Sequence, residues 1–177
     1  MNPPGGEPPQ GPAAGIAVSV LTVAGKTLCP GEASGELLRL DEPLSLWGGT
    51  DLRTGVITDI HHPQHGTAIT GRVLLTDASR GSSSSSSVLA EQIRAGAAPA
   101  AIILTTRDAI LTLGAIAAAE LYGILMPIVL IDGGDAAVLR GVGPGTITVT
   151  AVRGTAAITF GASGHPNTSD LSNRGTA

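Results

Sequence analysis

The apolar positions in the first half of the chain follow a strand-like pattern. Four apolar stretches lie between residues 16 and 76, and Gly, Pro or Asp residues separate them, which is typical of short strands joined by turns. The pattern predicts strands within residues 16–23, 35–40, 54–60 and 68–76.

The second half alternates between helix-like and strand-like patterns. Helices are predicted over 87–96 and 108–122, and Asp108 is placed to cap the second of them. Short apolar stretches predict strands over 100–105, 127–131 and 146–152, with a short helix over 132–141. Strands first, then helices alternating with strands, predict a mixed α/β domain, with a mixed sheet or partly closed barrel and flanking helices.

The two ends of the chain differ from this middle part. Residues 1–15 hold five prolines and four glycines and cannot build a packed element, so we expect a disordered lead. Residues 161–177 are polar and rich in turn-forming residues, which predicts a flexible tail. One ordered domain is therefore expected over residues 16–160.

The longest apolar run, residues 109–131, is interrupted by Glu120, Gly123 and Pro127. A charge and a proline within this length favour a buried helix followed by a strand over a membrane span. Residues 1–15 contain no Lys or Arg and no apolar stretch, unlike a signal peptide. We therefore expect a cytoplasmic protein with no membrane partner.

The charge balance argues against one class of partner. Ten Lys and Arg residues stand against fourteen Asp and Glu residues, which makes the net charge −4, and charged residues are only 14% of the chain. This composition provides no basic surface for a phosphate backbone, so nucleic-acid binding is not expected.

Cys29 is the only cysteine of the chain. One thiol cannot form an internal disulfide, and it cannot hold an iron–sulfur cluster or a zinc ribbon. Because Cys29 lies beside Pro30 and away from the polar motifs, we interpret it as structural. We expect no metal site in this chain, and soft-metal chemistry would need ligands from another chain.

The most unusual motif is Arg80-Gly81 followed by six serines, Ser82 to Ser87. Such a run can be a flexible linker or a simple helix cap. Its position between a predicted strand and a predicted helix favours a functional turn, in which N–H groups and hydroxyls bind an anion. A serine in this turn has two open roles: it holds an anionic group, or it acts as a base or nucleophile.

A second motif contains Trp47, the only tryptophan, followed by Gly48 and Gly49. The two glycines would allow a ligand or another backbone to lie against the chain. A binding site or interface at Trp47 and its burial in the core are both left open.

A third motif holds His61, His62 and His65 around Pro63. Because Pro63 bends the chain between the imidazoles, we favour a polar hairpin turn with exposed imidazoles over a metal cluster. The acidic pair within 132–135 is interpreted as a turn that caps a short helix, since a calcium loop needs further oxygen ligands.

The order of these motifs resembles the small subunit of the aconitase X family. The resemblance runs from about residue 31 to residue 132, and both tails fall outside it. It is carried by PLSLWGG at 43–49, TGVITDIHHPQHG at 54–66, RGSSS at 80–84 and APAAII at 98–103. Each segment alone is weak evidence, but their occurrence together in this order is specific.

The resemblance implies a swivelling β/β/α domain, equivalent to the mobile last domain of aconitase, that closes over a larger subunit. That large subunit would hold an iron–sulfur cluster or iron on its own cysteines. The catalytic base of the family would correspond to Ser82. We expect the substrate to be bound by Arg80, Gly81, Ser83, Trp47, Gly48 and Gly49.

The implied activity is that of a hydro-lyase, a dehydratase of a small hydroxy acid that works only as a heterodimer with the large subunit. The family has two substrate types, cis-3-hydroxy-L-proline and 5-phosphomevalonate. The Ala- and Gly-rich composition favours the first, which is the bacterial type. Two alternatives remain: a non-catalytic module that binds an anion in the serine turn, and a scaffold in which this turn only caps a helix.

Overall fold

The computed structural model describes residues 21–162, and within this range seven strands form a closed barrel in the order β1-β5-β4-β3-β2-β6-β7. The strands are β1 (Leu21–Cys29), β2 (Gly31–Arg39), β3 (Val73–Thr76), β4 (Ala101–Leu104), β5 (Ile128–Leu130), β6 (Gly145–Ala151) and β7 (Ala156–Ala162). The pairs β2–β3, β3–β4 and β4–β5 are parallel, and β1, β6 and β7 complete the ring through antiparallel pairs. This mixed α/β barrel confirms the predicted fold class.

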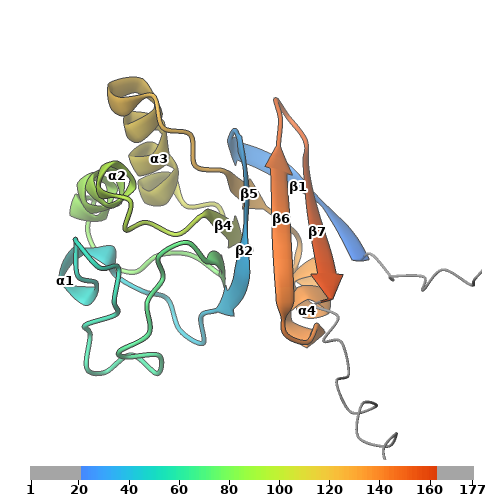
Figure 1. Cartoon of the computed structure of the whole chain (residues 1–177), viewed down its shortest axis with the longest axis horizontal. Coiled ribbons are helices and arrows are strands. Elements are labelled where there is room, and N and C mark those ends of the chain that lie inside the picture. Colours follow the sequence, from blue (N-terminus) through green and yellow to red (C-terminus); the bar gives the residue numbers. More distant parts are fainter. Residues whose placement is uncertain (1–20, 163–177) are drawn as a thin grey trace, which may run out of the picture.

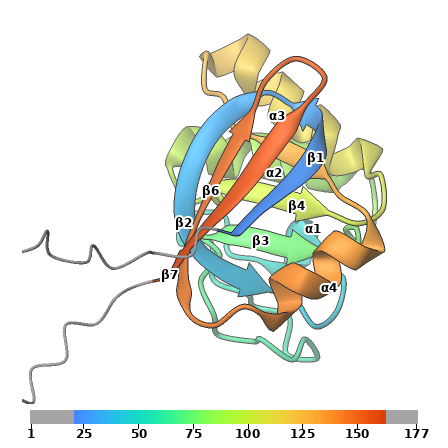
Figure 2. The same cartoon turned by 90° about the vertical axis from the view of Figure 1, so that its right-hand side faces the viewer.

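The helices are distributed unequally around the barrel. Helices α1 (Leu46–Gly49), α2 (Ser84–Ala95) and α3 (Ala109–Tyr122) lie on one side, and β1, β6 and β7 form the opposite side (Figure 1). Helix α4 (Gly133–Gly141) lies at one end of the barrel, away from α2 and α3 (Figure 2). The predicted helices over 87–96, 108–122 and 132–141 are thus present, and α2 begins three residues earlier than expected.

Strands β3 and β4 are buried on both faces. Their odd-numbered residues, Val73, Leu75, Ala101 and Ile103, belong to the cluster inside the barrel. Their even-numbered residues Leu74, Ile102 and Leu104 belong to the cluster under the helices. Strands covered on both sides have continuous apolar sequences, which explains why neither VLL nor AIIL alternates with polar residues.

Helix α4 fills the end of the barrel with apolar side chains. Ala136 and Leu139 join the interior cluster. Asp132 caps the helix, because its carboxylate accepts a hydrogen bond from the backbone N–H of Asp135 at 2.8 Å. The interpretation of residues 132–135 as a helix-capping turn is therefore confirmed.

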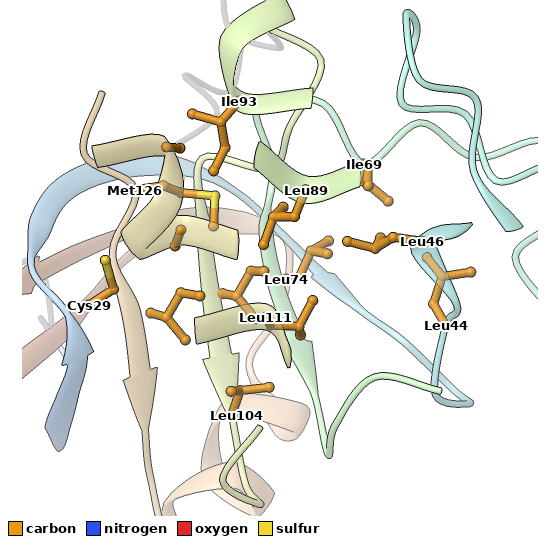
Figure 3. Packing of buried hydrophobic residues seen from close by; sticks show 14 of the residues in the cluster. Cys29, Leu44, Leu46, Ile69, Leu74, Leu89, Ile93, Leu104, Leu111 and Met126 are labelled. Atoms are coloured by element: carbon orange, nitrogen blue, oxygen red, sulfur yellow. The ribbon is translucent and has the colours of Figure 1, made fainter. Parts of the chain in front are cut away.

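A second cluster lies between the parallel strands and helices α2 and α3. Leu89 and Ile93 of α2 meet Leu111 of α3 over the strands (Figure 3). The two helices approach closely at Gly114, where a Cβ atom would lie 2.7 Å from the carbonyl oxygen of Ser86.

Cys29 belongs to the same cluster and is 1% exposed (Figure 3). Burial raises the pKa of its thiol above the ordinary value, so the group stays protonated at neutral pH. Both observations support the structural interpretation of this cysteine.

The bounds of β1, β2 and β3 differ from the predicted ranges, and two larger differences concern whole strands. Residues 54–60 form no strand and make only isolated bridges, because Gly55 turns the chain with a φ of 65° and packs against the backbone of Ala97. Strand β7 was not predicted, since its small residues conceal the alternation that its pairing with β1 and β6 reveals.

The predicted end segments fall mainly outside the described residues. The lead over 1–15 and residues 163–177 of the tail lie outside them, as do residues 16–20 of the first predicted strand, while Gly161 and Ala162 belong to β7. The apolar run over 109–131 folds as α3 followed by β5. None of the helices within 21–162 has the length and hydropathy required to cross a membrane.

The helix-side cluster predicts a strong dependence of stability on Leu89, which is fully buried. Leu89→Ala should lower the free energy of unfolding by about 2–5 kcal/mol, because it leaves a cavity between α2 and the strands. Leu113→Ala is the matched control on α3, where the side chain is 58% exposed, and should change it by less than about 0.5 kcal/mol. Urea denaturation followed by circular dichroism measures both, and equal losses would contradict this packing.

Candidate active site

The serine turn lies at the carboxyl edge of the parallel strands. Strand β3 ends at Thr76, and residues 77–83 lead directly into α2, which begins at Ser84. In open and barrel-like α/β folds, this edge is where loops gather and ligands bind. The local fold therefore places the start of the serine run in a strand-to-helix connection, as the sequence predicted, and its last four serines in the first turn of α2.

The six serines have different environments. Ser82, Ser83 and Ser84 are exposed, and so is Ser87 one turn further along α2. Ser85 is fully buried, and the hydroxyl of Ser86 donates to the carbonyl oxygen of Ile110 at 2.8 Å, which joins α2 to α3. Ser82, Ser83 and Ser84 are thus the serines that a ligand could contact at the same time as the N-terminal end of α2.

The start of α2 presents unpaired backbone donors. Ser83 occupies the N-cap position, but its side chain makes no capping hydrogen bond. The Oγ atom of Ser82 accepts a hydrogen bond from the N–H of Ser84 at 3.3 Å, which is long for such a bond. Within residues 21–162, the N–H groups of Gly81, Ser82 and Ser83 donate to no acceptor, so this helix end has the character of an anion site.

The segment that contains Trp47 lies beside the serine turn, as the position of α1 next to α2 shows (Figure 1). The N–H of Arg80 donates to the carbonyl oxygen of Leu44 at 3.2 Å. Gly81 has a φ of 109°, and a Cβ atom on it would lie 2.7 Å from the hydroxyl of Ser45, so only glycine fits here. Two segments that the sequence analysis singled out separately are therefore in direct contact.

Trp47 is 62% exposed, which excludes its burial in the core. Its backbone N–H is 3.4 Å from the hydroxyl of Ser85, and its backbone carbonyl oxygen accepts from the hydroxyl of Ser45 at 2.9 Å. Gly48 has a φ of 75°, and non-helical backbone at Trp47 and Gly48 interrupts α1. This turn holds the indole on the surface near the serines.

A buried glutamine of α2 anchors the same turn. The side-chain amide of Gln92 donates to the hydroxyl of Thr50 at 3.0 Å and to the carbonyl oxygen of Asp51 at 3.3 Å. Sequence reasoning did not find this residue, because a glutamine on a helix is normally solvated and only the tertiary structure buries it.

The loop over residues 54–66, called here the histidine-containing loop, contacts Arg80 through Asp59. The Arg80 guanidinium lies 2.9 Å from the Asp59 carboxylate. His61 and His65 are exposed as expected, but His62 is 3% exposed, which corrects the prediction of three exposed imidazoles. The ring of His62 is buried because its Nε2 bonds the carbonyl oxygen of Glu42 at 3.1 Å and its Nδ1 accepts from the N–H of Gln64.

A buried carboxylate supports the chain just before the serine turn. Asp108, 6% exposed, accepts from both the N–H and the hydroxyl of Ser79 at 2.6 Å. Its other oxygen caps α3 by accepting from the N–H groups of Ile110 and Leu111. Burial alone would raise the pKa of Asp108, but the hydrogen bonds from Ser79, Leu111 and Ile110 outweigh it and hold this pKa below its usual range. The sequence indicated the cap but not the contact with Ser79.

The residues of this chain do not fit an iron–sulfur cluster. The sequence contains one cysteine, and that cysteine lies in the core away from the serine turn. Among residues 21–162, no three His, Cys, Asp or Glu side chains are close enough together to hold a metal ion.

The closed α/β barrel with helices on one side is the fold of a class of swivel domains. The aconitase X swivel domain family matches residues 22–158, and the chain belongs to this family. The resemblance inferred from the motifs is therefore confirmed.

Two curated relatives of this chain carry the names of different dehydratases. The cis-3-hydroxy-L-proline dehydratase of Pseudomonas aeruginosa is 52% identical over 103 residues, which are 58% of this chain and 18% of that protein. The phosphomevalonate dehydratase small subunit of Methanothermobacter thermautotrophicus is 40% identical over 93 residues, which are 52% of this chain and 71% of that protein. The chain thus spans less than a fifth of the length of the first of these relatives.

A solved structure supports the same family. The crystal structure of Thermococcus kodakaraensis aconitase X in its holo-form contains a chain that matches with a TM-score of 0.65 and 30% identity. The match covers 78% of this chain and 98% of that one.

The double role of Asp108 predicts a pH-dependent contribution to stability. Asp108→Ala should lower the free energy of unfolding at pH 7 by about 1–2 kcal/mol, because the cap of α3 and the contact with Ser79 are lost together. The folded-state pKa lies below the unfolded value of about 3.9, so this contribution is complete above that pH and is lost as the pH falls through the folded-state pKa.

Urea denaturation at pH 7 and at several values below pH 4 measures the effect. Asp41→Ala, which changes an exposed carboxylate, is the control and should leave stability nearly unchanged at both ends of the range. A stability difference for Asp108→Ala that does not shrink in acid would contradict the role of the ionised carboxylate.

Proposed function

We propose that this chain is the small subunit of an aconitase X-type hydro-lyase and that it supplies Ser82 as the base to an active site completed by a large subunit. The observation that carries the proposal is the exposed hydroxyl of Ser82 at the start of α2, where neighbouring N–H groups have no acceptor within residues 21–162. Membership in the aconitase X swivel domain family supports the same role.

The proposed chemistry begins with the Ser82 hydroxyl. A serine acts as a base only when its alkoxide is stabilised, and donors placed in advance supply that stabilisation. The N–H of Ser84 already donates to Ser82 Oγ, and the positive end of α2 favours negative charge at this atom. Ser82 Oγ, as the alkoxide, would then accept the proton from the carbon next to the substrate carboxylate, the C–H electron pair would form the C=C bond, and the hydroxyl would leave from the neighbouring carbon on the side of the large subunit.

The substrate carboxylate would be held by the groups around Ser82. The N–H groups of Gly81 and Ser83, which have no acceptor among residues 21–162, and the guanidinium of Arg80 are donors of the kind that binds carboxylates. Trp47 and Gly48 are exposed on the adjacent turn, where they would form one wall of the composite site. Gly49 is buried, and it supports this turn by accepting hydrogen bonds from the N–H groups of Thr58 and Asp59.

We assign any iron–sulfur centre of such an enzyme to the large subunit, because the residues of this chain do not fit one. The role of the described residues is limited to binding the substrate, placing it and taking its proton. The assignment agrees with the lone, buried Cys29.

For the substrate we propose cis-3-hydroxy-L-proline. The support is the higher identity to the Pseudomonas aeruginosa dehydratase, 52%, compared with 40% to the archaeal phosphomevalonate dehydratase small subunit. The alternative is 5-phosphomevalonate, and the two are separated by assaying both with the assembled enzyme.

The proposal predicts that Ser82→Ala lowers kcat by about 10²–10⁴-fold, the usual contribution of a general base, while binding of the large subunit is unchanged. The assay mixes this chain with an aconitase X-type large subunit and follows dehydration of cis-3-hydroxy-L-proline. Ser87→Ala, a second exposed serine of the same run, is the matched control and should retain full activity.

The same assay distinguishes the alternative functions. Turnover retained in Ser82→Ala would overturn the assignment of the base. Stoichiometric binding of citrate or phosphate by the isolated chain, with no activity in the mixture, would favour the non-catalytic anion-binding module that the free N–H groups of Gly81 to Ser83 also suit.

The exposed indole predicts an optical signal on assembly. If the large subunit covers the face that carries the serine turn, the exposed indole of Trp47 loses contact with water, and its fluorescence emission shifts to shorter wavelength. Subtracting the spectrum of the Trp47→Phe complex isolates this contribution, because the chain has no other tryptophan. Identical spectra for the free and assembled chain would place Trp47 outside the interface.

A further inference from the structure

Asp59 is the residue at which three loops of the candidate site meet. Its N–H donates to the carbonyl oxygen of Gly49 at 3.3 Å, which connects it to the Trp47 turn. Its carbonyl oxygen accepts from the N–H of His62 at 3.1 Å, within the histidine-containing loop. Its carboxylate pairs with Arg80 at 2.9 Å, at the beginning of the serine turn.

Both oxygens of the Asp59 carboxylate are occupied. Oδ1 accepts from the N–H of His61 at 2.9 Å, and Oδ2 accepts from Arg80 at 2.9 Å. The hydrogen bond from the backbone N–H of His61 lowers the pKa of Asp59 and outweighs the opposing effect of burial, and the charge of Arg80 lowers it further. Asp59 is therefore a fixed anion, unsuited to accept a proton at neutral pH.

Arg80 keeps binding capacity while it is held by Asp59. Within residues 21–162, its side chain donates to Asp59 through Nη2, and 55% of the side chain is exposed. A guanidinium has five N–H donors, so donors remain for a carboxylate in the bidentate geometry that arginine prefers. A single contact that fixes the long side chain also reduces the entropy lost when a ligand binds.

We propose that Asp59 is a positioning residue that holds the Arg80 guanidinium in place to receive the substrate carboxylate, with the 54–66 loop as its scaffold. The substrate part of this inference rests on the proposed function. It gives a role to the histidine-containing loop, whose exposed imidazoles form no metal cluster among residues 21–162. The loop acts through hydrogen bonds to one aspartate.

A double-mutant cycle in the assembled enzyme tests the proposal. Asp59→Asn removes the charge and keeps the shape, and it should raise KM for cis-3-hydroxy-L-proline about tenfold with kcat changed less than about threefold. Arg80→Gln should raise KM by at least as much. The double variant should be no worse than Arg80→Gln alone, because Asp59 acts through Arg80. Multiplicative effects, or a loss confined to kcat, would overturn the proposal.

Two further variants separate positioning from a structural role. Asp59→Glu keeps the charge within reach of Arg80 and should restore KM to within about threefold of the original value. Glu36→Gln breaks the exposed ion pair between Arg72 and Glu36, 3.3 Å long, and should leave KM and kcat unchanged. Equal effects of Asp59→Asn and Glu36→Gln would contradict a specific role for Asp59.

A measurement on the isolated chain makes the test independent of catalysis. In NMR spectra, Asp59→Asn should shift the amide signals of Gly81 and Ser82 and broaden the guanidinium N–H signals of Arg80, whereas Glu36→Gln should do neither. Unchanged Arg80 signals would overturn the positioning role even in an active enzyme. An inactive wild-type mixture with the expected Arg80 response would instead refute the dehydratase assignment and leave the positioning of Arg80 intact.

Discussion

The burial of β3 and β4 on both faces is the constraint on which the rest of the structure depends. Val73, Leu75, Ala101 and Ile103 fill the barrel, and the residues between them require a helical cover on the outside. Parallel neighbours cannot be joined by a tight turn, so long crossover connections link them, and α2 and α3 form the crossovers that follow β3 and β4. The serine turn belongs to the crossover between β3 and β4, and its position at the carboxyl edge follows from the packing of the sheet.

Local signals made part of this structure predictable. Helix α3 has a capping aspartate at one end and Gly123 in a left-handed conformation at the other, so both of its ends can be recognised from the sequence. The strand expected over 54–60 is absent because Gly55 turns the chain there, and β7 was missed because its small residues conceal the alternation that its pairing with β6 and β1 reveals. The candidate site, too, was only partly predictable from the sequence. Its glycine and serine motif is visible in the sequence, whereas the contacts of Asp59 with Arg80 and of Asp108 with Ser79 exist only after folding.

The serine run shows how one repeated residue type can serve several structural needs. Ser86 joins two helices, Ser85 is buried near the Trp47 turn, and Ser82 remains on the surface. Two carboxylates hold two adjacent residues in the middle of the connection, since Asp108 binds Ser79 and Asp59 binds Arg80. The loop is therefore much better fixed than its composition suggests, which suits a site that must be formed before a ligand arrives.

Closure of the barrel also affects how this domain can meet other chains. An open sheet exposes unpaired N–H and C=O groups along its outermost strands, and these groups can pair with other chains to give aggregates. Across residues 21–162, every strand has a neighbour on each side, because β1 joins β5 to β7. Closure thus removes the free outermost strands of an open sheet, and backbone that pairs on one side only is confined, among the described strands, to parts of β1 and β2 and to the ends of other strands.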